Sequence, residues 1–233
     1  MLISGIQPLT LLDYPDRLAC IVFTPGCNFR CGYCHNPEFV LPEHIIRMKD
    51  GFIPEEYFFS FLEERRGLLE GVVVSGGEPT LAPDLIEVMK KIKALGFLVK
   101  LDTNGNRPDI LKKALESGAV DYVAMDVKTS LADYPQLVGS LVRPENIEAS
   151  ILLLKTSGIN YEFRSTLVKE HHTPEIRKNM VDMVTGAKRV CLQTFQPAVT
   201  LRPEFKAYHS FSAEEMNEIK ALFKDRCEEV VIR

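Results

Sequence analysis

Residues 24–36 read Thr-Pro-Gly-Cys-Asn-Phe-Arg-Cys-Gly-Tyr-Cys-His-Asn and place three cysteines, Cys27, Cys31 and Cys34, at CxxxCxxC spacing within eight residues. The stretch contains Gly, Pro and Asn and follows an apolar run, residues 18–23, that is typical of a β-strand. Thiolates are soft ligands that suit zinc, copper(I) or an iron–sulfur cluster. A closed zinc site and most protein-held clusters take a fourth ligand. Three sulfurs therefore predict a [4Fe–4S] cluster with one iron left open, or a zinc knuckle completed by His35, or unrelated thiols.

The composition limits the kinds of protein that the chain can be. With 233 residues, 45% of them hydrophobic, the chain is typical of a soluble globular protein. A net charge of −4 argues against a nucleic-acid surface, and we find no membrane span or signal segment. We therefore expect a cytoplasmic protein without nucleic-acid or membrane partners. Six cysteines in that compartment favour metal binding or catalysis, and clustered thiolates favour an anaerobic setting.

Strand-like and helix-like segments alternate along the chain. The expected strands are residues 18–23, 71–75, 97–101, 122–127, 161–168 and 190–195, and the expected helices are 55–66, 83–95, 109–117, 145–157, 174–185 and 212–226. A short terminal strand is expected at 230–232. Six β-then-α units without a linker predict one α/β domain over residues 1–233. The count fits a partial (β/α)6 barrel, three-quarters of a (β/α)8 barrel, with an open doubly wound sheet as the alternative.

Polar residues gather where each expected strand stops. In parallel α/β folds the active site lies at these carboxyl ends. The ends are the cysteine loop, Ser75-Gly76-Gly77-Glu78-Pro79, Asp102-Thr103-Asn104-Gly105, Asp126-Val127-Lys128, Arg164-Ser165-Thr166 and Gln193-Thr194-Phe195-Gln196. The pattern predicts a single mouth that brings acids, a lysine and an arginine to the metal loop.

Each strand end has a chemical interpretation and a structural one. Gly76 and Gly77 let a ligand approach the main chain closely, and Glu78 can receive an ammonium group; a plain turn is the alternative. Asp102 and Asn104 can receive ribose hydroxyls or an ammonium, although Asp-Thr-Asn-Gly also suits an Asx turn. All five residues are candidates for binding a cofactor.

Asp126 and Lys128 lie two apart on a strand and therefore share one face. An inward lysine beside an aspartate is costly unless each is paired or bound to a ligand, and a ligand carboxylate is one such partner for Lys128. A lysine at the barrel rim is the alternative. Arg164 is expected to serve the same site, with an ion pair to Asp126 open to it.

Two further segments carry expectations. His171 and His172 are adjacent, so their side chains point apart, and we expect both to be solvated. Residues 134–144, which include Tyr134 and Arg143, form an insertion that is expected to be a docking edge for a partner.

Six stretches resemble one family of enzymes. They are LTLLDYP, VFTPGCNFRCGYCHNPEF, RRGLLEGVVVSGGEPTL, LDTNG, MDVK and EFRSTLV. The cysteine loop, with Tyr33 before the last cysteine, is similar to that of the radical S-adenosylmethionine (SAM) superfamily. The whole set, from about Leu9 to Pro197, resembles the activating proteins of anaerobic ribonucleoside-triphosphate reductase, relatives of the pyruvate formate-lyase activating enzymes.

The resemblance implies a set of cofactor residues. It places the ligands of a [4Fe–4S] cluster on Cys27, Cys31 and Cys34, whereas Cys20, Cys191 and Cys227 have no such role. The implied SAM contacts are Tyr33, His35, Gly77, Asp126 and Lys128. It further implies that one electron from the cluster cleaves SAM, and that the resulting 5′-deoxyadenosyl radical removes a hydrogen atom from a glycine of a partner enzyme.

One position departs from the pattern. Pyruvate formate-lyase activases have a histidine at the end of the last barrel strand, where this chain has LQTFQPA with Gln196 nearest. This difference implies another way of holding the SAM carboxylate and a target other than formate-lyase. The implied partners are a glycyl-radical enzyme, anaerobic ribonucleotide reductase, and an electron donor such as flavodoxin or ferredoxin. A radical SAM enzyme for another glycyl-radical enzyme, or for a small molecule as in 7-carboxy-7-deazaguanine synthase, is the alternative.

Overall fold

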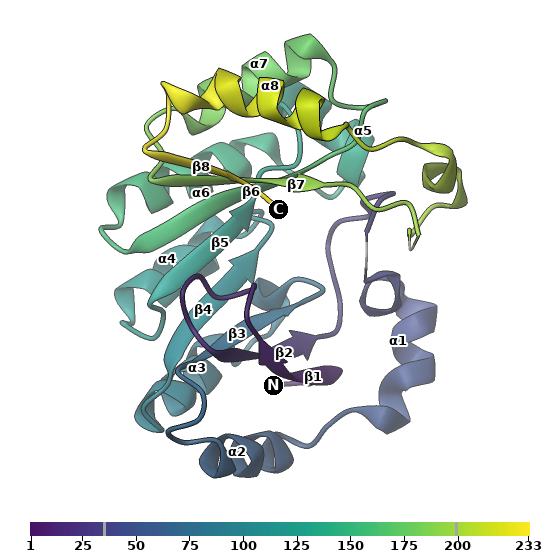
Figure 1. Cartoon of the computed structure of the whole chain (residues 1–233). Helices are drawn as coiled ribbons and strands as arrows, with labels where there is room; N and C mark the ends of the chain where they lie inside the picture. The colour runs from purple at the N-terminus through teal and green to yellow at the C-terminus, as the bar shows by residue number, and fades with distance from the viewer. Residues whose placement is uncertain (35, 199) are drawn as a thin grey trace. The chain divides into compact units, whose positions relative to one another are not determined.

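The computed structural model describes residues 1–34, 36–198 and 200–233, and it has the α/β organisation expected from the sequence (Figure 1). The chain forms two compact units. The first contains Met1–Asn28, Glu38–Thr103 and Asp109–Val123, and the second contains Phe29–Pro37, Asn104–Pro108 and Ala124–Arg233. The cysteine loop therefore contributes to both units, and a single domain over residues 1–233 stays a prediction.

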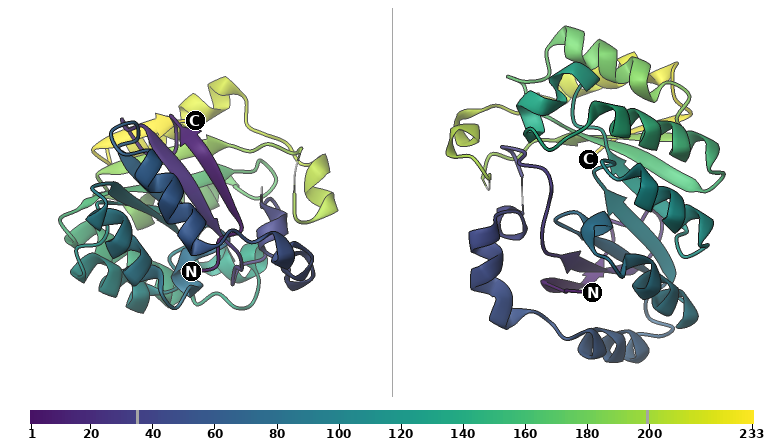
Figure 2. Two further views of the ribbon diagram at one scale, coloured as in Figure 1. Left: turned by 90° about the horizontal axis from the view of Figure 1, so that it is seen from below. Right: turned by 180° about the vertical axis from the view of Figure 1, so that it is seen from behind.

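The first unit is a set of strands with helices between them. Its elements are β1 (Gly5–Thr10), β2 (Ala19–Thr24), α1 (Pro42–Met48), α2 (Glu55–Glu64), β3 (Gly71–Gly76), α3 (Leu85–Ala94), β4 (Leu98–Thr103) and most of α4 (Pro108–Glu116). β1 pairs antiparallel with β2, β2 pairs parallel with β3, and β3 pairs parallel with β4. Figures 1 and 2 show the hairpin of β1 and β2 in purple.

Apolar burial explains why these segments form strands and helices. Val72, Val73 and Val74 of β3 are fully buried, as expected for a parallel strand that is covered on both faces. In α3 the buried side chains are Leu85, Val88, Met89 and Ile92, which lie on one face at helical spacing. The predicted elements of this unit are therefore confirmed to within a few residues.

The second unit has parallel strands covered by helices. Its elements are α5 (Tyr134–Val138), α6 (Pro144–Thr156), β6 (Asn160–Leu167), α7 (Pro174–Val184), β7 (Arg189–Thr194), the 3-10 helix η5 (Pro203–Ala207), α8 (Ala213–Lys224) and β8 (Glu229–Ile232). β6 pairs with β7 and β7 with β8, both parallel. α7 and α8 lie side by side in both figures. The boundary between the units falls within β5 (Tyr122–Asp126), after Val123.

One strand and two α-helices among the described residues were not predicted. β1 contains Pro8, which lacks an N–H donor and is tolerated because this strand pairs through one edge with β2. The helices α1 and α5 have seven and five residues, too short for a helical period to show in the sequence. All three are therefore elements that only the packed chain reveals.

The expected docking edge at residues 134–144 needs correction. Tyr134 is fully buried, and Leu137 and Val138 are 4% and 1% exposed. The Tyr134 hydroxyl accepts a hydrogen bond from the backbone N–H of Lys128, at 3.0 Å. A side chain held in this way is not available to a partner, so the prediction that Tyr134 forms a docking surface is wrong.

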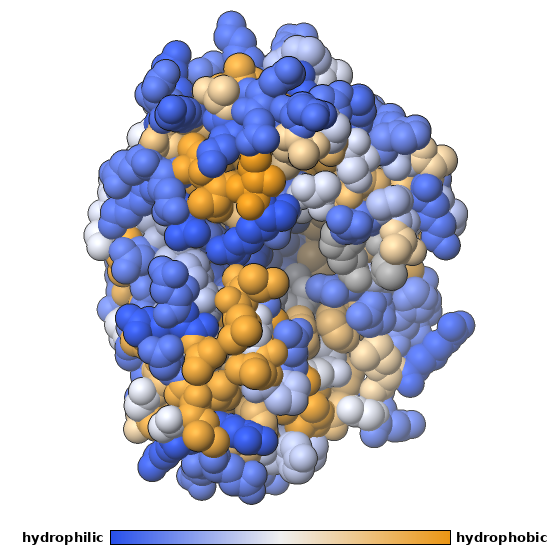
Figure 3. Space-filling view, in the orientation of Figure 1, coloured by the Kyte–Doolittle hydropathy of each residue, from blue (hydrophilic) through white to orange (hydrophobic). Residues whose placement is uncertain are grey.

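Exposed leucines gather on the first unit near the β1–β2 hairpin. Leu9, Leu11 and Leu12 are 53%, 66% and 73% exposed. Figure 3 shows hydrophobic residues over the region where Figure 1 draws the turn between β1 and β2. Such a group is typical of a surface that another molecule covers. None of the helices among the described residues has both the length and the apolar composition to cross a membrane.

Candidate functional site

The loop after β2, which leads into Cys27, lies against the Gly76-Gly77 turn in the first unit. Gly77 N–H donates to the Thr24 carbonyl at 2.8 Å, and Glu78 N–H donates to the Gly26 carbonyl at 2.7 Å. A Cβ atom on Gly77 would lie 2.0 Å from the Gly26 oxygen. Glycine is therefore required at position 77 for the close approach of the two backbones.

This arrangement changes the reason for the two glycines. The sequence suggested that the glycines leave main-chain N–H groups open to a ligand. In the structure, the N–H groups of Gly77 and Glu78 instead donate hydrogen bonds to carbonyl groups of the cysteine loop. Gly76 has a φ of 118°, in the region that favours glycine. A role of Gly76 and Gly77 toward SAM stays a prediction. The structure shows that they allow the loop that leads into Cys27 to pack closely against this turn.

Glu78 is a buried acid that organises the same turn. It is 1% exposed, and its Oε1 atom accepts hydrogen bonds from Thr80 N–H at 3.1 Å and from the Thr103 hydroxyl at 2.8 Å. The Thr80 hydroxyl also donates to this oxygen. Glu78 thus joins the end of β3 to the end of β4, and a contact with an ammonium group stays a prediction.

Asp102 at the end of β4 is paired with a lysine that the sequence analysis did not single out. Lys100 is fully buried, and its ammonium group contacts the Asp102 carboxylate. The Ser75 hydroxyl donates to the other oxygen of Asp102 at 3.0 Å. Lys100 and Asp102 lie two apart on one strand, so the pattern Lys-x-Asp was the available signal. The contact of Asp102 with a cofactor stays a prediction.

In the second unit, the turn with Cys31 and Cys34 is tightly held. Cys34 N–H donates to the Cys31 carbonyl at 3.1 Å, which closes the turn. Gly32 accepts a hydrogen bond from Arg202 N–H at 3.0 Å, and a Cβ on Gly32 would lie 2.0 Å from the Phe205 ring. The turn between the two cysteines therefore rests against η5.

The three thiols differ in burial, and residues 1–34, 36–198 and 200–233 contain no group of three His, Cys, Asp or Glu side chains placed to hold a metal ion. Cys31 is 7% exposed, and burial raises the pKa of its thiol to about 11, although the charge of Lys128 opposes this rise. A metal that binds there must displace the proton. Cys27 and Cys34 are half-buried. His35, the predicted SAM contact and alternative zinc ligand, lies outside the described residues.

A cluster of three charged side chains lies beside this turn. Lys128 Nζ is 3.1 Å from Asp126 Oδ2, and Arg164 Nε is 2.9 Å from Asp126 Oδ1. Burial would raise the pKa of Asp126, but the charges of Arg164 and Lys128 outweigh it and lower the pKa to about 2. The ion pair of Arg164 with Asp126, which the sequence left open, is present, so Asp126 is shared by two positively charged side chains.

Tyr33 connects the cysteine turn to that cluster. Its side chain is 4% exposed, and Lys128 Nζ lies 5.9 Å from the centre of its ring. Burial raises the pKa of its hydroxyl well above the ordinary value. The hydroxyl is buried without a hydrogen-bond partner among the described residues. A buried polar atom of this kind favours a ligand that is bound here in the complete enzyme.

The last two predicted residues lie in loops. The Asn104 side chain accepts a hydrogen bond from Asn106 N–H at 3.0 Å, which is the Asx turn that the sequence allowed. Gln196 follows β7 and is exposed. Their predicted contacts with SAM stay predictions.

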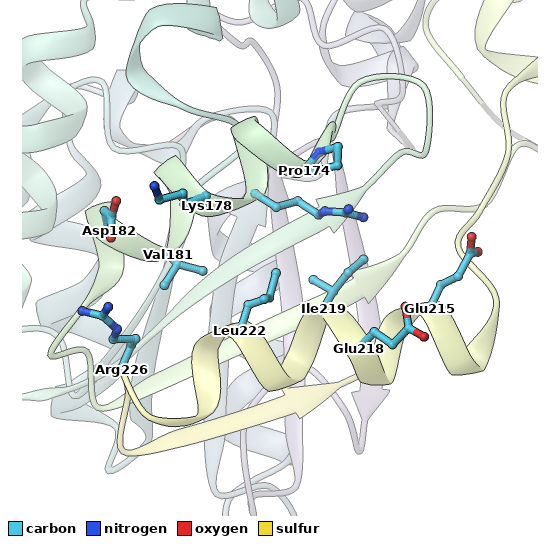
Figure 4. A pocket seen from close by; sticks show the side chains of 10 residues that line it. Pro174, Lys178, Val181, Asp182, Glu215, Glu218, Ile219, Leu222 and Arg226 are labelled. Atoms are coloured by element: carbon cyan, nitrogen blue, oxygen red, sulfur yellow. The ribbon is translucent and has the colours of Figure 1, made fainter.

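A groove of about 540 Å³ lies elsewhere, between α7 and α8 (Figure 4). Val181, Ile219 and Leu222 give it apolar side chains, and charged residues such as Lys178, Asp182, Glu215, Glu218 and Arg226 flank them. None of the predicted site residues is among the described residues that line it. This groove is therefore separate from the candidate site.

Comparison with known proteins defines the class. A model of the radical SAM superfamily matches residues 21–184. A Methanocaldococcus jannaschii protein, provisionally named a glycyl-radical enzyme activating enzyme, is 35% identical over 239 residues, covering 100% of this chain and 95% of that protein. The pyruvate formate-lyase-activating enzyme of Clostridium pasteurianum is 34% identical over 139 residues, covering 54% of this chain and 52% of that enzyme. The chain therefore belongs to the radical SAM superfamily, in the family of these activating proteins.

Solved structures agree on the fold. Streptococcus suis SuiB bound to the precursor peptide SuiA has a TM-score of 0.66 at 15% identity, over 91% of this chain and 47% of that one. SuiB bound to S-adenosylmethionine has a TM-score of 0.60 at 15% identity, over 91% of this chain and 51% of that one. At this identity the likeness concerns the fold alone. The α/β fold of the partial-barrel type expected from the sequence is confirmed.

Membership of the superfamily also confirms the cofactors. Radical SAM enzymes use a [4Fe–4S] cluster and SAM, so this chain is an iron–sulfur oxidoreductase and not a zinc-binding interaction module. The residues present fit these groups. Three thiols suit a cluster with an open iron, and the positively charged Lys128 and the buried Tyr33 hydroxyl suit the carboxylate-bearing end of SAM.

The close contact at Gly77 leads to a first prediction. Gly77→Ala should reduce the iron bound per chain although no ligand is removed, because the new methyl group displaces the loop that leads into Cys27. The strain should also destabilise the protein by about 1–3 kcal/mol. Iron analysis and urea unfolding measure the two effects. Gly51→Ala is the matched control, since nothing lies within 4 Å of the added Cβ; equal iron in both variants would contradict the proposed seating of the loop.

The lowered pKa of Asp126 leads to a second prediction. A carboxylate whose folded pKa is depressed adds stability above its unfolded pKa, and that stability is lost as pH falls through the folded pKa of about 2. The stability advantage of the wild type over Asp126→Asn should therefore shrink by about 1 kcal/mol between pH 6 and pH 3. Urea unfolding of the cluster-free proteins measures it, with the exposed Asp50→Asn as control. An advantage independent of pH would contradict the ion pairs.

Proposed function

We propose that this chain activates a glycyl-radical enzyme, most specifically anaerobic ribonucleoside-triphosphate reductase. The observation that supports it best is the match to the Methanocaldococcus jannaschii protein, which spans the whole of this chain and carries the name of a glycyl-radical enzyme activating enzyme. The Asp126–Lys128–Arg164 cluster beside the cysteine turn is the geometry expected for a SAM site.

Cys27, Cys31 and Cys34 hold the cluster in this proposal. When bound, the cluster supplies the electron that cleaves SAM reductively, so that methionine and 5′-deoxyadenosine leave and a glycine of the partner loses a hydrogen atom. The electron comes from a donor protein such as a flavodoxin or ferredoxin. The remaining cysteines take no part: Cys20 and Cys191 are fully buried within β2 and β7.

The protein residues bind and orient SAM. Lys128 neutralises its carboxylate, Asp126 fixes Lys128 and Arg164, and the Tyr33 hydroxyl finds a partner when the ligand is present. The proposed set of SAM contacts also includes Gly76, Gly77, Glu78, Asp102, Asn104, His35 and Gln196. Holding the reacting atoms in place is the main contribution of the protein to such chemistry.

The proposal also includes a cellular compartment and a choice among glycyl-radical enzymes as partner. We place the enzyme in the cytoplasm under anaerobic conditions. Gln196, at the position where formate-lyase activases have a histidine, favours the reductase over formate-lyase. Activation of another glycyl-radical enzyme, or action on a small molecule, is the alternative that the experiment below distinguishes.

Changing Lys128 tests the SAM site. Lys128→Ala should keep the iron content and the absorption near 400 nm, because no cluster ligand is removed. SAM affinity should fall about tenfold or more, as expected when a charge-assisted hydrogen bond is lost. Anaerobic calorimetric titration with SAM measures the dissociation constant. A lost cluster with unchanged SAM affinity would remove Lys128 from this role.

The partner is tested by electron paramagnetic resonance. The reduced, cluster-loaded protein mixed with SAM and the reductase should produce a glycyl-radical signal, and Cys31→Ala should abolish it. SAM cleavage without a signal on the reductase, but with one on another glycyl-radical enzyme, would select the alternative partner. Cleavage with no protein radical on either would favour a small-molecule substrate.

A further inference from the structure

His172 is a buried histidine that the reaction outlined above does not use. It lies on the turn between β6 and α7 and is 1% exposed, so the expectation that it is solvated is wrong. Its two ring nitrogens face different partners. Nδ1 lies 2.9 Å from Val168 N and 3.0 Å from Val168 O, and Nε2 lies 2.9 Å from the carbonyl oxygen of Lys128.

The hydrogen bonds define which nitrogen carries the proton. Val168 N–H is a donor and requires an unprotonated Nδ1, while the Val168 carbonyl already accepts the backbone N–H of His172 at 2.9 Å. The Lys128 carbonyl is only an acceptor and requires a proton on Nε2. In the other neutral tautomer, with the proton on Nδ1, the unprotonated Nε2 atom and the Lys128 carbonyl oxygen would face each other as two acceptors. His172 is thus a neutral imidazole that donates to Lys128, and burial lowers its pKa in agreement with this form.

The backbone of Lys128 is held from its other side by Tyr134. β5 ends at Asp126, so Lys128 lies beyond the strand. The buried Tyr134 hydroxyl accepts Lys128 N–H at 3.0 Å, and His172 donates to Lys128 O. Because peptide units are planar, fixing both units that flank Lys128 fixes its φ and ψ and hence the direction of its side chain. These two residues therefore fix the direction in which the Lys128 side chain leaves the backbone, and the ion pair with Asp126 completes the placement of its ammonium group.

We propose that His172 and Tyr134 are positioning residues that clamp the backbone of Lys128 and thereby set its ammonium group for the SAM carboxylate. The inference rests on the proposed role of Lys128. It adds that a histidine from the turn after β6 controls SAM affinity without touching SAM. A residue that acts in this way loses its effect when Lys128 is absent.

The first test compares two replacements of His172. His172→Leu leaves the Lys128 carbonyl without its donor and should weaken SAM binding about tenfold, with unchanged iron content. His172→Gln offers an amide N–H to the same carbonyl and should bind SAM within about threefold of the wild type. Anaerobic calorimetric titration with SAM measures both. His209→Leu is the matched control, because this side chain is 75% exposed and contacts Glu170.

One further variant keeps the test decisive if His172→Leu does not fold. Tyr134→Phe removes only the hydroxyl that accepts Lys128 N–H, and it should weaken SAM binding by a similar factor. In the Lys128→Ala background, neither Tyr134→Phe nor His172→Leu, where it folds, should weaken binding further, because the positioned group is gone. A purely structural role would instead give additive losses.

The outcomes separate this inference from the proposed function. If Lys128→Ala binds SAM like the wild type, the proposed role of Lys128 is wrong. The inference that His172 and Tyr134 position Lys128 for SAM is then wrong as well. If Lys128→Ala weakens binding while Tyr134→Phe and every folded His172 variant bind normally, the SAM site stands and this inference is overturned. Additive losses in the double variants overturn it as well.

Discussion

The ion pairs of Asp126 with Lys128 and Arg164 are the interaction on which the candidate site depends. A lysine and an arginine removed from water are each costly, and one carboxylate between them offsets only part of that cost. The positive charges of Lys128 and Arg164 favour an anionic ligand beside them, which supports the proposed role of Lys128 toward the SAM carboxylate. Fixed charges of this kind need no reorganisation when the ligand binds, which is the usual advantage of a prepared site.

Much of this site could be predicted because its chemistry is local in sequence. The spacing of Cys27, Cys31 and Cys34 needs no folded structure to be noticed, and Asp126 with Lys128 follows from the two-residue period of a strand. The alternation of strands and helices was equally visible, because fully buried strands such as β3 consist of continuous apolar residues. In these cases a few consecutive residues of the sequence are enough to make the prediction.

The contacts that support the site could not be predicted, because they join residues far apart in the chain. His172 reaches a carbonyl 44 residues away, and the Phe205 ring fills the space beside Gly32. Tyr134 is only six residues from Lys128, but its role depends on α5, which is too short to be predicted. His171 illustrates the same limit, since its ring stacks on Phe205 at 5.1 Å and supports the aromatic residue behind the cysteine turn.

Two adjacent histidines therefore serve two parts of the site because adjacent side chains point apart. His172 supports Lys128 through a hydrogen bond to its backbone, and His171 supports the cysteine turn through Phe205, which also lies 6.0 Å from the Tyr33 ring. These two supporting contacts are neutral or apolar, and the charged side chains are the ones proposed to meet SAM. This separation has a physical reason: a charged support would change the field at the ligand, whereas a neutral imidazole or an aromatic ring fixes geometry alone. The turn after β6 can thus position Lys128 and the cysteine turn through neutral contacts. The charge at the candidate site comes from Asp126, Lys128 and Arg164.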